Sequence, residues 1–176
     1  MRSRWGIKPN QIAVLCQVSA STKGRELDLG WLAQRLGERY VVLGRGSKVK
    51  AAPGVIDVTT HLHIDELMVA SDIAVFDYSS VRFDYALTDK PMVYWIPALE
   101  ETFSRTPPLW PYEETTAGPC VRERGALVTA IRNSIQAPGA WATDREALRQ
   151  RVAPFDDGHA AARLADRVVD YLTLGL

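Results

Sequence analysis

Two serines before a predicted helix offer the most specific chemistry in the sequence. Ser79 and Ser80 follow an apolar run at 72–76 and close the Asp-Tyr-Ser-Ser turn at 77–80. Serine at a helix start can cap free backbone N–H groups. The same N–H groups, at the positive end of the helix dipole, can instead hold a phosphate. The local pattern leaves both interpretations open, and Asp84, about one turn into the helix, also suits the dipole.

A second group is basic and lies in a loop that contains glycine. Arg45, Lys48 and Lys50 follow the apolar run at 40–43, with Gly44 and Gly46 between them. Cations in such a loop can neutralise a diphosphate, and a solvated basic loop is the alternative. The glycine spacing is too short for a Walker or dinucleotide fingerprint.

Other reactive side chains give weaker signals. His61 and His63 are too few for a zinc site without a third ligand. The paired carboxylates at 100–101 and 113–114 can act as a base or bind ribose, or form a solvated acidic surface. The two cysteines lie far apart in the sequence and form neither a disulfide framework nor a metal cluster. We therefore expect no metal and no cofactor.

The elements that position these residues alternate along the chain. Apolar runs predict strands at 11–18, 40–43, 55–58, 72–76 and 91–96. Helices are predicted at 27–39, 64–70, 79–87, 125–136, 143–152 and 159–174, and a long Pro- and Gly-containing irregular loop at 105–119.

Alternating strands and helices are typical of an α/β fold. We expect one Rossmann-like lobe over residues 1–176, with a parallel sheet of about five to six strands and helices on both faces. In such sheets ligands bind beyond the carboxyl ends of the strands. The loops at 19–24, 44–50, 59–63, 77–80 and 97–118 are therefore the ones expected to carry function.

Composition excludes several classes of protein. The 176 residues are 47% apolar and carry 21 basic and 21 acidic side chains, which argues against a disordered chain and a basic nucleic-acid binder. Residues 1–50 hold 10 basic and 3 acidic residues, a net charge of +7 that favours an anionic ligand. No apolar run reaches the roughly 18 residues of a membrane span. We expect a cytoplasmic protein without a secretory signal.

Four segments resemble one enzyme family, the CDP-glycerol glycerophosphotransferases of teichoic acid synthesis. Residues 77–91, Asp-Tyr-Ser-Ser-Val-Arg-Phe-Asp-Tyr-Ala-Leu-Thr-Asp-Lys-Pro, resemble the family's signature. Residues 64–72 are similar to the helix and strand that precede it, residues 112–119 to its acidic loop with Gly-Pro, and residues 155–163 to its closing segment. The similarities follow the family's order across roughly 55–165.

The resemblance implies the nucleotide-holding lobe of a two-lobed GT-B-type transferase. Such a lobe would bind a CDP-linked polyol, whose polyol phosphate passes to a teichoic-acid-like acceptor, at the inner face of the cell membrane as a candidate location. The candidate substrate-binding residues are Arg45, Ser47, Lys48, Thr59, Asp77, Ser79, Ser80 and Asp84. No catalytic residue is assigned.

Two departures from the family leave activity open. Ser47 stands where the family typically carries histidine, and serine cannot replace histidine as an acid near neutral pH. The family's other lobe, with its His-Gly-Thr-type motif, has no counterpart here, so a partner protein or a separate acceptor lobe is expected. The alternative to a transferase domain is a non-catalytic half-transferase, or a degenerate fragment, acting as a binding module.

Overall fold

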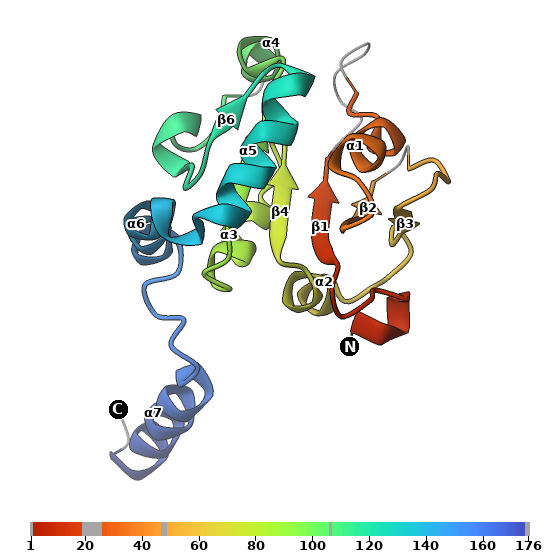
Figure 1. Cartoon of the computed structure of the whole chain (residues 1–176). Helices are drawn as coiled ribbons and strands as arrows, with labels where there is room; N and C mark the ends of the chain where they lie inside the picture. The colour runs from red at the N-terminus through yellow and green to blue at the C-terminus, as the bar shows by residue number, and fades with distance from the viewer. Residues whose placement is uncertain (1, 19–25, 47–48, 106, 175–176) are drawn as a thin grey trace.

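The computed structural model describes residues 2–18, 26–46, 49–105 and 107–174. Its centre is a six-stranded, all-parallel sheet with the strand order β3-β2-β1-β4-β5-β6 (Figure 1). The strands are β1 (Ile12–Gln17), β2 (Tyr40–Arg45), β3 (Val55–Asp57), β4 (Ile73–Phe76), β5 (Met92–Trp95) and β6 (Cys120–Val121). The predicted parallel α/β fold is confirmed.

Helices connect the strands. The α-helices are α1 (Leu29–Leu36), α2 (Ile64–Ala70), α3 (Val81–Ala86), α4 (Leu99–Arg105), α5 (Arg124–Gln136), α6 (Ala142–Val152) and α7 (Ala160–Leu174). Short 3-10 helices are η1 (Arg2–Trp5), η2 (Tyr112–Thr115) and η3 (Pro138–Trp141).

Both faces of the sheet are covered, because successive strand residues point to opposite sides. Ala13 and Leu15 belong to one apolar core, which includes residues of α2, α3, α4 and α6. Val14 and Cys16 belong to the other core, which includes residues of α1 and α5. All four of these strand residues are fully buried. The interior of β1 is therefore a continuous apolar run, as is typical of a central strand in a parallel sheet.

Helix α1 is shorter than the predicted helix at 27–39. Asp28 caps it, accepting a 3.0 Å hydrogen bond from the Trp31 amide. Gly37 ends it with a φ of 89°, a left-handed conformation that favours glycine. The apolar spacing predicts the buried face of α1, whereas its ends are set by these two residues.

The prediction of an irregular loop at 105–119 is wrong in part. Helix η2 lies within it, β6 follows it, and α4 occupies the segment just before it. Acidic residues in the first turn of α4 suit the helix dipole. Strand β6 has only two residues, too few for a periodic pattern.

Helix α7 stands apart from the sheet and its covering helices (Figure 1). All described side chains over residues 154–173 are exposed, although one side of α7 is apolar. The exposed apolar residues of this side are Leu164, Val168, Val169, Tyr171 and Leu172. Within the described part of the chain, the helices are too short or too polar to cross a membrane.

Candidate nucleotide-binding edge

The direction in which the chain adds strands reverses between β1 and β4. From β1 the chain adds β2 and β3 on one side, then returns to place β4, β5 and β6 on the other. Parallel sheets bind ligands in the crevice outside the carboxyl ends of the strands at such a switch point. Gln17 marks it, since this last residue of β1 pairs in register with Arg45 of β2 and Phe76 of β4.

Arg45 is held at this edge by its neighbour. Its Nη1 atom donates a 3.0 Å hydrogen bond to Oε1 of Gln17. Its Nε atom is buried and has no hydrogen-bond partner among the described residues. The predicted cation therefore stands beside the switch point, fixed by Gln17.

Thr59 joins the ends of β2 and β3. Its Oγ1 atom donates to the Gly46 carbonyl at 3.0 Å, and the Gly46 amide lies 3.2 Å from the same atom. A Cβ atom on Gly46 would stand 2.7 Å from the carbonyl oxygen of Val18, so glycine permits the chain at Gly46 to approach the chain at Val18. The Thr59 side chain and the Thr59 amide both form hydrogen bonds to Asp57, and these two bonds lower the pKa of the Asp57 carboxyl. Thr59 thus has a structural role at the edge.

The 77–80 turn lies directly after β4. Oδ1 of Asp77 accepts a hydrogen bond from the Ser79 amide at 3.2 Å, and Oγ of Ser79 accepts one from the Val81 amide at 3.3 Å. Ser80 is exposed, and its side chain makes no capping hydrogen bond. Ser79 therefore caps the first backbone amide of α3, whereas the Ser80 side chain is exposed.

An aromatic cluster supports this turn from behind. The Tyr78 ring lies 5.6 Å from Phe103 of α4 and 6.0 Å from Tyr112 of η2, measured between centroids. The Tyr78 hydroxyl accepts a 3.0 Å hydrogen bond from the Ala98 amide, and partial burial raises its pKa. The Tyr112 hydroxyl donates to the carbonyl oxygen of Asp77. The segments after β4 and β5 are therefore packed together.

The structure brings most of the candidate residues to one edge of the sheet. Arg45 and Thr59 lie on one side of the switch point, and Asp77, Ser79 and Ser80 lie on the other. Asp84 is exposed on α3, about one turn beyond Ser80. Ser47 and Lys48 lie outside the described residues.

The histidines and paired carboxylates mostly take structural roles. The His61 ring packs edge-on against Trp5 at 5.2 Å, and its Nε2 atom is 3.1 Å from Oε2 of Glu66, so its contacts join η1 to α2. Glu100 pairs with Arg122 at the surface. In the described ranges, no three His, Cys, Asp or Glu side chains gather where they could hold a metal ion.

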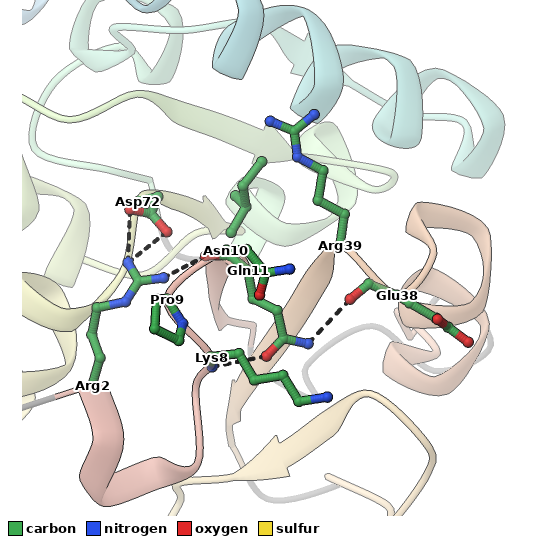
Figure 2. Close-up of a pocket in the computed structure, with 9 residues that line it drawn as sticks. Arg2, Lys8, Pro9, Asn10, Gln11, Glu38, Arg39 and Asp72 are labelled. Carbon is green, nitrogen blue, oxygen red and sulfur yellow. Dashed lines mark hydrogen bonds and ion pairs between the residues drawn. The ribbon is translucent and has the colours of Figure 1, made fainter.

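A large depression opens at the opposite edge, around the amino ends of β1, β2 and β4 (Figure 2). It has a volume of about 810 Å³. Arg2 dominates it, donating to both carboxylate oxygens of Asp72 at 2.8 Å and to the Gln11 carbonyl at 2.5 Å. Gln11 in turn donates to the Glu38 carbonyl at 3.1 Å. These hydrogen bonds tie Arg2, Gln11, Glu38 and Asp72 together, and the depression lies away from the carboxyl ends of the strands, where parallel sheets bind ligands.

Comparison with known families gives a match over most of the chain. Residues 14–170 match the family described as CDP-Glycerol:Poly(glycerophosphate) glycerophosphotransferase. The matched segment includes all six strands, apart from the first two residues of β1, and most of α7. The resemblance carried by the 77–91 signature is confirmed.

Curated relatives act in teichoic acid synthesis. The teichoic acid ribitol-phosphate primase of Bacillus spizizenii is 34% identical over 122 residues, which are 69% of this chain and 30% of the primase. The teichoic acid glycerol-phosphate transferase of Staphylococcus aureus is 26% identical over 148 residues, covering 80% of this chain and 38% of that protein. The chain therefore spans less than half the length of these relatives.

Solved structures show the same fold. The wall teichoic acid polymerase TagF matches 96% of this chain and 45% of its own, with a TM-score of 0.77 and 22% identity. A TagF variant soaked with CDPG matches with a TM-score of 0.74 and 22% identity, over 96% of this chain and 44% of that one. The fold is thus that of one part of TagF.

Proposed function

From the premise that the chain belongs to the CDP-Glycerol:Poly(glycerophosphate) glycerophosphotransferase family, we propose that it binds a CDP-linked polyol at the carboxyl edge of its sheet. The ligand's diphosphate lies over the switch point between β1 and β4. Arg45 neutralises it from one side, and the 77–80 turn donates hydrogen bonds from the other. Glycerol is the first polyol to test, since the family's description contains it.

The observation that carries this proposal is the position of Gln17. This residue pairs with the last residue of β2 and with the last residue of β4. Arg45 and the turn at 77–80 are therefore neighbours of the same strand end, although they are far apart in the sequence. A half-buried guanidinium and an exposed serine hydroxyl suit a diphosphate.

The proposed transfer moves the polyol phosphate to an acceptor hydroxyl. The acceptor oxygen forms a bond to the polyol-bearing phosphorus, the phosphorus–oxygen bond to CMP breaks, and the hydroxyl proton passes to a base. Positive charge and N–H donors stabilise the charge that develops on the phosphoryl oxygens. The proposed transfer requires no cofactor, since the CDP-linked polyol is its substrate.

The base and the acceptor site are proposed to lie on a second lobe or partner protein. The chain spans 30% and 38% of the two curated relatives, so those proteins contain much more polypeptide. The exposed apolar side of α7 supports docking of such a lobe. Its opposite side carries Arg163, Asp166, Arg167 and Asp170, a balanced charge that suits a protein surface better than an anionic membrane.

Calorimetry with the purified chain tests the binding part. CDP-glycerol and CDP are expected to bind with a Kd below about 1 mM, equivalent to about −4 kcal/mol, and CMP more weakly because it lacks the second phosphate. Folded protein that releases no heat with CDP-glycerol at millimolar concentration contradicts the proposal.

A second assay separates a complete enzyme from a half-transferase. The chain is incubated with CDP-glycerol and a glycerol-phosphate oligomer, and CMP release is measured. We expect binding without transfer. Transfer by the isolated chain would remove the need for a second lobe, whereas the absence of both binding and transfer would favour a degenerate module.

A further inference from the structure

Arg82 is a buried cation without a carboxylate partner among the described residues. It is the second residue of α3 and is 5% exposed. One terminal nitrogen, Nη2, donates to Oγ1 of Thr115 at 2.9 Å. The Nε and Nη1 atoms are buried and have no hydrogen-bond partner in the described structure. Burying a charge in this way is costly unless other contacts offset it.

Two aromatic rings provide such contacts. The Arg82 guanidinium carbon lies 4.1 Å from the ring centroid of Tyr112 and 4.6 Å from that of Phe83. A guanidinium near aromatic faces gains cation–π and stacking energy, more so where water is excluded. Tyr112 is itself 2% exposed, so this contact is desolvated.

The contacts of Arg82 lead to the proposed ligand site in two steps. Thr115, which accepts from Arg82, donates through the same Oγ1 atom to the Tyr112 carbonyl at 2.9 Å. Tyr112 then donates its hydroxyl proton to the carbonyl oxygen of Asp77, the first residue of the 77–80 turn. The guanidinium thus holds η2 in the position from which it supports the turn.

We propose that Arg82 is a positioning residue that fixes the 77–80 turn through η2. This inference rests on the proposed function for its effect on ligand binding. A methionine of similar length would fill the same space without burying a charge, but it would not orient the Tyr112 ring or hold Thr115. The role of the guanidinium is therefore orientation of the turn, beyond the filling of space.

The chain supplies a matched control in Arg145 of α6. This arginine is 3% exposed, pairs with Asp89 at 3.0 Å and donates to the Pro138 carbonyl. Asp89 precedes β5 by only a few residues, so Arg145 lies towards the amino end of the sheet. Arg145→Met should destabilise the fold without disturbing the turn.

The experiment compares Arg82→Met, Arg82→Lys, Tyr112→Phe, the Arg82→Met/Tyr112→Phe double variant and Arg145→Met. For each, we measure thermal unfolding, hydrogen exchange of the Ser79 and Val81 amides by NMR, and the Kd for CDP-glycerol. Exchange is compared at conditions of equal global stability, so that loss of stability alone does not affect the comparison.

Arg82→Met is expected to increase hydrogen exchange at these two amides and to weaken CDP-glycerol binding about tenfold. This loss is within the range of interaction free energies for residues in contact. Arg82→Lys keeps the charge without the planar fork and should recover part of the affinity. The double variant should bind no more weakly than the weaker single variant, because both changes break one chain of contacts. Arg145→Met should bind like wild type.

Unchanged exchange in Arg82→Met, relative to Arg145→Met, overturns the positioning role. Faster exchange with wild-type affinity overturns the link to ligand binding. If the wild-type chain does not bind CDP-glycerol, the proposed function is rejected, and hydrogen exchange alone still decides whether Arg82 fixes the turn.

Discussion

Oε1 of Gln17, at the end of β1, accepts a 3.0 Å hydrogen bond from Nη1 of Arg45, at the end of β2. The bond crosses between neighbouring parallel strands and keeps the guanidinium beside the switch point. It also leaves the Nε atom of Arg45 without a partner among the described residues. The half-buried guanidinium is therefore fixed at the carboxyl edge, where it can form charge-assisted hydrogen bonds to an anion.

Replacing Arg45 with glutamine should weaken CDP-glycerol binding about tenfold, since a charge-assisted hydrogen bond contributes about 1.5–3 kcal/mol. The dependence of Kd on salt concentration should also become flatter. Gln17→Leu should have a smaller effect, because the cation remains but loses its anchor. Calorimetry at low and high salt measures both changes. Arg39→Gln, an exposed change at the amino edge, is the control, and equal losses in Arg39→Gln and Arg45→Gln would contradict the assignment.

The two serines should separate stability from binding. Ser79→Ala removes the Oγ acceptor of the Val81 amide, and losing a helix cap costs about 1 kcal/mol. Ser80→Ala should leave the free energy of unfolding unchanged, because the Ser80 side chain is exposed and caps nothing. Ser80→Ala should nevertheless weaken CDP-glycerol binding. Urea unfolding and calorimetry make the comparison, and wild-type affinity in Ser80→Ala would remove that hydroxyl from the proposed site.

The sequence predicts the sheet well because its central strands are buried on both faces. In β1 and β4 every interior position is apolar, so each strand is a short run with a clear start and end. The strand ends in turn locate Arg45 and the 77–80 turn. Once parallel topology is inferred, the carboxyl edge follows from strand direction alone.

Other features depend on tertiary contacts that no local pattern reveals. Arg82 sits inside the recognised signature, yet its burial depends on Tyr112 and Thr115, which come from a segment about thirty residues later. His61 lies in a loop expected at the ligand edge, but packing against Trp5 takes it into the contact between η1 and α2. Sequence spacing cannot anticipate such partners.

The Asp89–Arg145 pair should make stability depend on acid pH. The Arg145 hydrogen bond, assisted by Arg149, lowers the pKa of Asp89 below its ordinary value. A carboxyl with a lowered folded-state pKa contributes stability that is present above its unfolded-state pKa, near 3.9. That contribution is lost as the pH falls through the lower, folded-state pKa.

Asp89→Asn tests this dependence. The Asp89 backbone is in a left-handed conformation with a φ of 55°, which asparagine tolerates. The change therefore removes charge without backbone strain. We expect the variant to be less stable than wild type at neutral pH by a small amount, since Asp89 is exposed, and to approach wild type below pH 4. Urea unfolding from pH 3 to pH 7 checks this, and a stability difference independent of pH would argue against the ion pair.

Removing α7 should leave the rest of the fold intact. Every described side chain over residues 154–173 is exposed, so a chain ending at residue 153 loses no core contact made by those side chains. Its thermal midpoint should stay within about 2 °C of wild type, and CDP-glycerol affinity should be unchanged.

A chain ending at residue 141 also loses α6 and its buried Leu148. This change is expected to lower the free energy of unfolding by at least the roughly 2–5 kcal/mol of a core truncation. Thermal unfolding of both truncated chains tests this prediction. If removal of α7 alone lowers the thermal midpoint as much as the longer truncation, α7 is part of the folded unit. Its apolar side is then not available to a partner lobe.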